Sequence, residues 1–276
     1  MAVLGASGGG GTLPQITLAH SQTFTAPQDG NVCIHVVGAG GGGQGKYNDA
    51  AGGGAGGYCK KNSLAVTSGQ TFTVVVGVGG HGGQDGGGDG GNSTVAGGSL
   101  SATLTANGGV GGASNGTQGT GGTASNGDVN NTGGAGDAGN GGAVGVTAEG
   151  ADGREQGSGT YGAGSGVAGK SDASGGGLGM SGFGQIVGGN RSGDSINCQT
   201  SANLQNGSFI GNPDGEDLCG GGAVQWYGSL GNVVSDVCGG HGGIGGGGGA
   251  GRCAYSNTQS RGGRGGDGIV LFQYIS

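Results

Sequence analysis

The sequence has few of the side chains from which most globular proteins build a core. Of its 276 residues, 9% are charged and 4% are aromatic, three are proline and one is tryptophan. A conventional packed core over the whole chain is excluded, because large side chains are too sparse for one. The low proline content also excludes collagen, which needs abundant proline and an unbroken Gly-X-Y register.

Glycine takes the place of these side chains and accounts for 86 residues. A glycine-rich chain can be a flexible linker, since it buries too little apolar surface to offset the entropy of ordering. Six segments argue against a linker, because their apolar residues alternate with period two and they end at turn residues. These segments predict β-strands at 23–25, 32–37, 58–66, 71–78, 100–105 and 269–275.

The glycines also recur at every third position, which a flexible linker does not require. The polyproline-type helix has three residues per turn, a rise of about 3.1 Å per residue and no internal hydrogen bonds, so such helices must bond to one another. Glycine at every third position allows N–H groups to pair with carbonyl groups of a neighbouring backbone. A bundle of polyglycine II helices is therefore predicted. Its structural glycines are Gly133, Gly136, Gly139, Gly142 and Gly145, then Gly239, Gly242, Gly245, Gly248 and Gly251, then Gly262, Gly265 and Gly268.

The expected fold is mostly β and irregular, with essentially no α-helix. Residues 269–275 should return to pair with the strands of 23–105, so that a small antiparallel β-structure from both ends of the chain clamps the glycine bundle. Residues 1–22 are assigned to an N-terminal arm that could serve for attachment, and 23–276 to one glycine-rich domain. Within that domain we expect a β-rich part at 23–105, the helix bundle with its loops at 106–268 and a closing strand at 269–276.

A recognisable order of motifs runs along the chain after about residue 22. TFTAPQDGNVCIHVVGAGGGG is followed by AGGYCKKNSLAVTSGQTFTVVVGVGGHGG, by long glycine tracts and by GGRGGDGIVLFQYIS. This order resembles the glycine-rich domains of phage tail-fibre and receptor-binding proteins. The resemblance implies a polyglycine-helix sandwich at the tip of a tail fibre, with exposed loops that bind a receptor on the bacterial surface, either an outer-membrane protein or a glycan. It also implies attachment to a tail-fibre or other virion protein.

The ends and the charge of the chain limit its location and partners. The stretch MAVLGASGGGGTLPQ lacks a basic region followed by an apolar one, and no apolar run of 18 residues occurs. We therefore expect no membrane insertion, synthesis in the host cytoplasm and a place in the virion, with an extracellular bacterial protein as the alternative. The net charge of −7 argues against nucleic acid, which requires clustered Lys and Arg.

Catalytic motifs are not convincing. Matches to nucleotide-binding loops at 157–162 and 164–171 lack the preceding strand and following helix that hold a phosphate. No nucleophile, base and orienting group occur at a suggestive spacing. We expect no enzyme activity, no cofactor and no bound metal.

Histidine and cysteine are the remaining groups with chemistry to consider. The histidines are expected to be tolerated polar residues. Six cysteines could form three disulfides, but cytosolic assembly favours free buried thiols or a pairing such as Cys219 with Cys238. A zinc site from these two cysteines with His241 and Cys253 has suitable ligand types but unsuitable spacing. The full set is His20, His35, His81 and His241 with Cys33, Cys59, Cys198, Cys219, Cys238 and Cys253.

Recognition should reside in segments that interrupt the glycine tracts, because glycine helices present little chemistry. The least regular segment, 185–237, contains the single tryptophan, Trp226, and aromatic rings give contact area at low entropy cost. The alternative is that Trp226 and Phe209 fill a small satellite core under this loop. The candidate receptor-binding residues are Trp226, Tyr227, Phe209, Arg191, Tyr161, Phe183, Tyr255 and Tyr47.

The sequence thus favours a non-catalytic adhesin at the tip of a phage tail fibre. The competing hypothesis is a structural protein, either a virion decoration or an extracellular filament subunit, in which glycine layers provide stiffness and copies associate. An adhesin predicts aromatic loops exposed together at one end. A structural subunit predicts the same aromatic residues buried against neighbouring copies.

Overall fold

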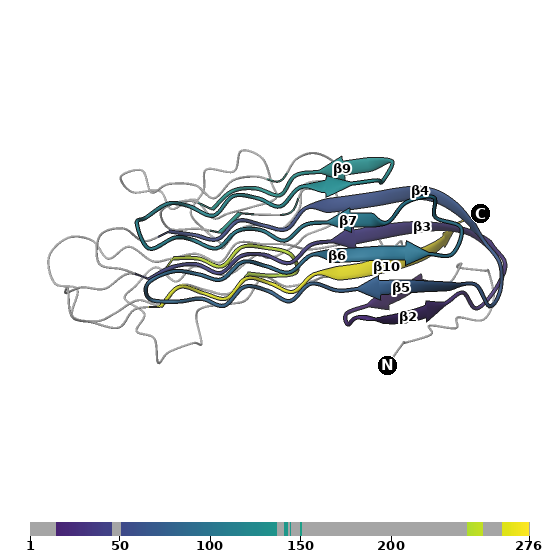
Figure 1. The fold of residues 1–276 in the computed structure, drawn as a ribbon, viewed down its shortest axis with the longest axis horizontal. Helices are drawn as coiled ribbons and strands as arrows, with labels where there is room; N and C mark the ends of the chain where they lie inside the picture. The colour runs from purple at the N-terminus through teal and green to yellow at the C-terminus, as the bar shows by residue number, and fades with distance from the viewer. Residues whose placement is uncertain are drawn as a thin grey trace, which may run out of the picture.

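A computed structural model of the chain describes residues 15–45, 51–136, 141–142, 144, 150, 242–250 and 261–275. In these residues the regular elements are all β-strands, and they form two five-stranded antiparallel sheets (Figure 1). The expectation of a mostly β and irregular fold without α-helix is confirmed for this part of the chain.

The two sheets interleave strands from both ends of the described chain. In spatial order, sheet A contains β1 (Gln15–Leu18), β10 (Ile269–Ile275), β3 (Gly30–Val37), β4 (Tyr58–Val66) and β9 (Val129–Asn131). Sheet B contains β2 (Gln22–Thr25), β5 (Thr71–Val75), β6 (Ser93–Gly97), β7 (Leu104–Ala106) and β8 (Ala124–Ser125). Because β10 pairs with both β1 and β3, the late strand closes against early ones, as predicted.

The predicted strand bounds are correct where the apolar pattern is longest, and they are wrong where the strand adjoins glycine residues. β4 and β10 have the predicted bounds, whereas β5 stops at Val75 because the backbone from Gly77 onward bonds to glycine segments. Of 100–105, only the end belongs to β7, because Gly97 and Gly98 adopt positive φ and turn the chain before it. The strands β1, β6, β8 and β9 are not predicted, and β1 lies within the segment assigned to an N-terminal arm.

The inner faces of the sheets enclose a side-chain core. Phe24, Phe72 and Phe272 meet at its centre, with ring centroids 4.2, 5.4 and 6.1 Å apart. The surrounding core residues are aliphatic side chains from both sheets, among them Ile34 and Leu104, each fully buried. We call this part the sandwich. Burial of each large side chain is worth about 1.5–3 kcal/mol, so these few rings and branched chains hold the two sheets together.

Each sheet continues into a layer of glycine segments. These segments lie side by side in the same order as the strands to which they connect. Layer A continues sheet A and contains 262–268, 38–45, 51–57 and 133–136, whereas layer B continues sheet B and contains 77–83, 87–92, 107–112 and 119–123. In Figure 1 these segments extend side by side from the strands as undulating traces. The sandwich therefore sets the order in which the glycine segments are stacked.

Hydrogen bonds in the glycine layers repeat every three residues. In segment 38–45, the N–H groups at 38, 41 and 44 donate to the carbonyls at 57, 54 and 51 of the adjacent segment in layer A. The N–H groups at 39 and 42 donate to the carbonyls at 91 and 88 in layer B. The N–H groups at 40 and 43 donate to the carbonyls at 266 and 263, on the other side in layer A. From 38 to 44 the N–H groups thus donate to three neighbouring segments in turn, with N···O distances of 2.8–3.1 Å, while carbonyl groups of the segment accept from 77–83, 107–112 and layer C. This threefold repeat is what polyglycine helices require, and their helical conformation stays a prediction.

The close approach of these backbones explains why glycine is needed. A Cβ added at Gly41 would overlap the carbonyl group of Val110, and one added at Gly54 would overlap that of Thr120. Both obstacles are backbone atoms, which cannot move aside by changing a rotamer. The segments also carry a few side chains, such as that of Ala39, which is small and fully buried, and that of Val78, which is exposed on the outer surface of layer B.

A partial third layer, layer C, lies against layer A. It contains 141–142, 144 and 242–250, and Gly248 bonds to Gly41 and Gly53 of layer A. Towards the sandwich, Val144 and Ile244 of this layer pack on the outer face of sheet A, where Leu271 and Tyr58 are buried. Sheet A is therefore covered on both faces at its end next to the glycine layers, which explains why Ile269 and Leu271 of β10 are apolar as well as Val270 and Phe272.

Candidate functional site

The glycine segments reverse direction at the end of the layers remote from the sandwich, which we call the distal end. Gln44 N donates to Ala51 O over 2.8 Å at the base of 46–50, and Gly263 N donates to Gly249 O over 2.8 Å at the base of 251–260. Gly136, the last described residue before 137–140, is also at this end and bonds to Gly119. The chain therefore leaves the described structure at the distal end in three separate places.

The strand ends lie at the opposite pole. Gln15 is paired with Gln273 and Asn31 with Ile275, at the end of sheet A that faces away from the glycine layers. The sandwich and the layers thus separate the first and last described residues from the distal turns along the length of the molecule (Figure 1).

Two described turns show the chemistry of the distal end. In the turn at 113–118, Ala113 N donates to Thr117 O over 2.8 Å, and Gly116 adopts a φ of 80° that only glycine takes readily. The second turn lies between Gly83 and Gly87. Exposed polar residues on the two turns are Ser114, Asn115, Thr117 and Gln118 with Gln84 and Asp85. These hydroxyl, amide and carboxylate groups can hydrogen-bond a polar surface, but they include no paired acid and base.

The eight candidate receptor-binding residues lie outside the described residues. Tyr47 is in 46–50 and Tyr255 in 251–260, both of which start and finish at the distal end. The other six, which are Trp226, Tyr227, Phe209, Arg191, Tyr161 and Phe183, are in the segment between 150 and 242. Their role as a receptor site stays a prediction.

The described residues on the two sides of that long segment lie in different parts of the structure. Gly150 N donates to Thr132 O over 2.8 Å, next to β9, whereas the chain after the segment enters layer C, where Gly247 N donates to Gly142 O over 3.0 Å. Gly245, with a φ of 69°, leaves room for Val144, since an added Cβ would lie 2.6 Å from Val144 Cγ2. The segment thus leaves from Gly150 beside β9 and returns at Gly242 in layer C, whose N–H donates to Arg264 O over 2.9 Å.

The predicted structural glycines fall partly in the described layers. Gly133 and Gly136 lie in layer A, and Gly142, Gly242 and Gly248 lie in layer C, where an added Cβ would overlap a backbone carbonyl in each case. Gly262, Gly265 and Gly268 form one row of layer A, donating to carbonyls at 83, 80 and 77 of layer B. Gly139, Gly145, Gly239 and Gly251 lie outside the described residues.

A buried polar cluster lies on the outer face of sheet A. His35 is 1% exposed, its Nδ1 is 2.7 Å from the Tyr58 hydroxyl and its Nε2 is 3.3 Å from Cys33 Sγ. Burial, helped by the positive charge of Lys60, lowers the pKa of His35 to about 3. The imidazole is therefore neutral at physiological pH. Reasoning from the sequence missed this cluster, because a histidine in an apolar strand was taken for a tolerated polar residue.

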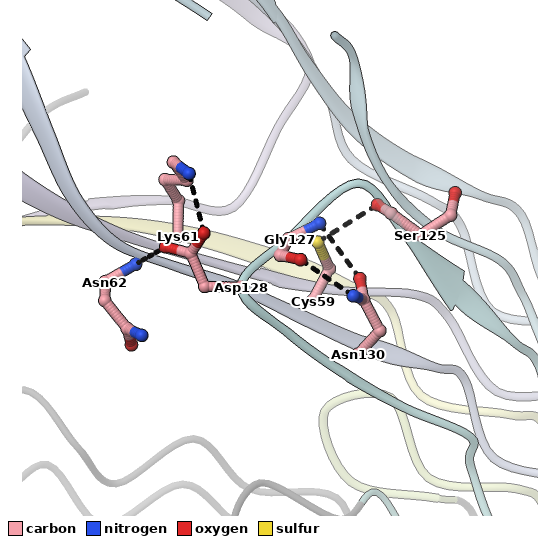
Figure 2. Close-up of polar contacts among 7 residues, drawn as sticks. All are labelled: Cys59, Lys61, Asn62, Ser125, Gly127, Asp128 and Asn130. Carbon is pink, nitrogen blue, oxygen red and sulfur yellow. Dashed lines mark hydrogen bonds and ion pairs between the residues drawn. The ribbon is translucent and has the colours of Figure 1, made fainter. Parts of the chain in front are cut away.

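Cys59 is a second buried thiol, beneath the turn that joins β8 to β9 (Figure 2). Its Sγ donates to Ser125 O over 3.3 Å, and an added Cβ at Gly127 would lie 2.6 Å from the sulfur. Burial raises the pKa of Cys59 to about 11, so the thiol stays protonated and unreactive. Cys33 and Cys59 form no disulfide. The other four cysteines lie outside the described residues, so a pairing such as Cys219 with Cys238 stays a prediction.

The same turn is tied to β4 by a charged contact (Figure 2). Asp128 accepts from Lys61 Nζ over 2.6 Å and from Asn62 N over 2.8 Å, and these bonds lower the pKa of the carboxyl. Asn130 exchanges two hydrogen bonds with the Gly127 backbone, of 2.8 and 3.0 Å. These bonds tie the turn between the two sheets to β4, so the contact has a structural role.

Comparison with known families identifies the family of this chain. A family model described as a glycine-rich domain matches residues 16–275. The chain belongs to the glycine-rich domain family. Curated proteins offer no match to it. Within the described ranges of this glycine-rich domain, no three His, Cys, Asp or Glu side chains gather as metal ligands would, and no helix is long and apolar enough to cross a membrane.

Proposed function

We propose that this glycine-rich domain is a non-catalytic adhesin at the tip of a phage tail fibre, which binds a bacterial surface receptor through loops at its distal end. The observation that carries the proposal is the bracketing of 46–50 and 251–260 by hydrogen bonds at one pole, opposite the ends of β1 and β10. A body of hydrogen-bonded layers with connecting segments at one pole suits a receptor-binding module, because binding residues are usually on loops that a rigid scaffold positions.

The proposed receptor is an outer-membrane protein or a glycan. Hydroxyl and amide side chains of the described distal turns bind such surfaces through hydrogen bonds, and the aromatic residues between 150 and 242 supply apolar contact. The proposed attachment to the fibre or another virion protein is through the opposite pole, at the sandwich. In this proposal the protein is made in the host cytoplasm and acts in the virion.

Binding to intact cells of candidate host strains tests the proposal. The variant Trp226→Ala with Tyr227→Ala should lose binding while its melting temperature is unchanged, and the matched control, Thr23→Ala with Thr73→Ala on the exposed face of sheet B, should bind like the wild type. Outer-membrane vesicles treated with protease, compared with untreated vesicles, distinguish a protein receptor from a glycan.

Three results would contradict the adhesin proposal or one part of it. Binding that survives in the Trp226 and Tyr227 variant would remove these residues from the site. Equal loss of binding in the control variant would move recognition to the sandwich. Absence of binding to every host strain, with ordered assembly as the protein is concentrated, would favour a virion decoration or filament subunit.

A further inference from the structure

The two sides of the sandwich end differently. On one side, β8 and β9 are joined by a turn, and Asp128 of that turn is tied to β4. On the other side, β1 is the edge of sheet A and β2 the edge of sheet B, and no described segment pairs with either strand from outside. In Figure 1, β2 and β9 lie at opposite margins of the ribbon. The sandwich therefore has one closed side and one side with two free strand edges.

The hydrogen bonds of β2 show which of its backbone groups face outward. Ala26 N donates to Gln70 O over 2.8 Å, in register with the pairs between β2 and β5. Hydrogen-bonded pairs alternate with non-bonded pairs along an antiparallel ladder. The backbone groups of Phe24 therefore point towards β5, and the N–H and C=O groups of Thr23 and Thr25 point away from the sheet.

The same alternation applies to β1. Gly38 N donates to the segment that leads into β4, so every second residue of β3 is bonded to β4 and the others are bonded to β10. Carried across β10, this pattern directs the backbone of Phe272 towards β1 and that of Ile16 towards β10. The N–H and C=O groups of Gln15 and Thr17 therefore point outward.

The outward groups of each strand flank one central residue, which is Phe24 in β2 and Ile16 in β1. The two central residues lie at the same level of the sandwich, because Ile16 is paired with Phe272, whose ring centroid is 4.2 Å from that of Phe24. A two-fold axis normal to the sheets at this level brings β2 of one copy antiparallel to β2 of another. The same axis brings β1 antiparallel to β1. In both pairs each outward N–H then faces an outward C=O.

The two edges lack most of the features by which edge strands are usually protected. Their sequences, QITL and QTFT, contain no charged residue and no proline, and no bulge interrupts their pairing with β10 and β5. The inward side chains of Ile16 and Phe24 belong to one core cluster, so paired copies would continue that core. Each strand has four residues, so specific association depends on pairing both edges about one axis.

We propose that two copies of this chain associate through β1 and β2 about this axis, so that each sheet of one copy continues into the same sheet of the other. The partner is a second copy because its edges carry the same outward groups at the matching positions. The axis reverses the strands, so the glycine layers of the two copies extend in opposite directions. The inference concerns the sandwich and does not depend on the adhesin proposal, to which it adds a particle with a distal end at each of its two ends.

Sedimentation velocity tests this proposal with Thr17→Pro/Thr23→Pro against the matched variant Thr17→Val/Thr23→Val. Proline removes the outward N–H at both positions without removing a bond of its own sheet, whereas valine keeps both donors. The wild type and the valine variant should form dimers, and the dissociation constant of the proline variant should be at least tenfold higher. A wild type that is monomeric even at about 1 mM, where weak pairing is populated, overturns the proposal. A folded proline variant that dimerises as readily as the wild type also overturns it.

Disulfide cross-linking between copies tests the register and does not require the proline variant to fold. In the proposed pair, Thr23 of one copy is opposite Thr25 of the other, with a Cα separation of about 5.5 Å that a disulfide can span. Under mild oxidation, an equimolar mixture of Thr23→Cys and Thr25→Cys should give at least tenfold more cross-linked dimer than either variant alone. The wild type measures the background from native cysteines. Equal yields from the mixture and the single variants would place the contact elsewhere and overturn the proposal.

Discussion

The sandwich and the glycine layers are continuous in the chain but are held together by opposite means. In the sandwich, side chains such as Phe72 and Phe272 fill the space between sheets, and stacked sheets of this kind lie about 10 Å apart. In the layers, the backbones themselves are in contact through N–H···O bonds such as that from Gly54 to Val110, 2.9 Å long. The same order of segments is thus maintained first by apolar burial and then by backbone hydrogen bonds.

This difference determines what each half can tolerate. A side-chain core can repack around a substitution, because its members have rotamers and partly compressible contacts. A backbone core has no such freedom, since most of its glycines lie against backbone carbonyl groups, as Gly41 and Gly54 do. The sandwich should therefore yield gradually to mutation, and the layers should fail at the addition of one carbon atom.

The substitution Gly54→Ala should destabilise the layers most strongly. The new Cβ would overlap the carbonyl of Thr120, and relief requires moving a backbone that also bonds to Val110. We expect a loss in the free energy of unfolding of more than about 4 kcal/mol, in the range reserved for severe structural damage. Chemical denaturation followed by circular dichroism measures this loss.

Gly86→Ala is the matched control for that prediction. An added Cβ at Gly86 would have its nearest neighbour at 3.6 Å, an ordinary contact, and Gly86 does not adopt a positive φ. The substitution should leave stability unchanged or raise it by about 0.4–1 kcal/mol, because alanine reduces the entropy of the unfolded chain. Equal stability of the Gly54 and Gly86 variants would contradict a core made of backbone.

Acid should act on the sandwich before the layers, because His35 is buried in sheet A. The imidazole has a pKa of about 3 when folded and 6.5 as its ordinary value, so the unfolded chain binds the proton first. Stability is unaffected above pH 6.5 and falls as the pH drops below it, by about 2–3 kcal/mol at pH 4.5. Comparison of wild type with His35→Gln between pH 7 and pH 4.5 isolates this loss.

Amide hydrogen exchange measures which part of the molecule loses protection in acid. At pH 4.5 the amide of Val36, beside His35, should lose protection relative to that of Gly41 in layer A, whose partners are uncharged peptide groups. A wild-type stability curve parallel to that of His35→Gln would show that the histidine does not control the acid response.

The sequence is most informative where one local pattern is sufficient. Apolar alternation predicts β4 and β10 with the observed bounds, and the three-residue glycine register predicts segments that bond outward in three directions. Four strands escape prediction because they are short and rich in Gln, Asn, Ser, Thr or Ala, as at β6 and β9. Such strands are specified by the neighbours with which they pair.

The hydrogen-bond partners of side chains are less predictable, for a related reason. Gly108 is hydrogen-bonded to Asn92, and His35 to Tyr58. The spacing of these residues along the chain predicts neither contact. Both follow from the order of the segments, which is a property of the whole fold. The aromatic residues at 226 and 227 lie outside the described residues, so their assignment continues to depend on composition alone.

Phe72→Leu tests the tolerance of the sandwich and should have the smallest effect of these changes. Phe72 is fully buried beside Phe24 and Phe272, and leucine keeps an apolar side chain while leaving part of the ring's volume empty. We expect a loss of about 1–2 kcal/mol, since neighbouring side chains can move towards the space. Thr73→Val, on the exposed face of the same strand, controls for changes in strand propensity. If removal of much of an aromatic ring here destabilises the protein more than one added methyl group at Gly54, the layers are not the less tolerant half, and backbone contact is not what makes glycine necessary.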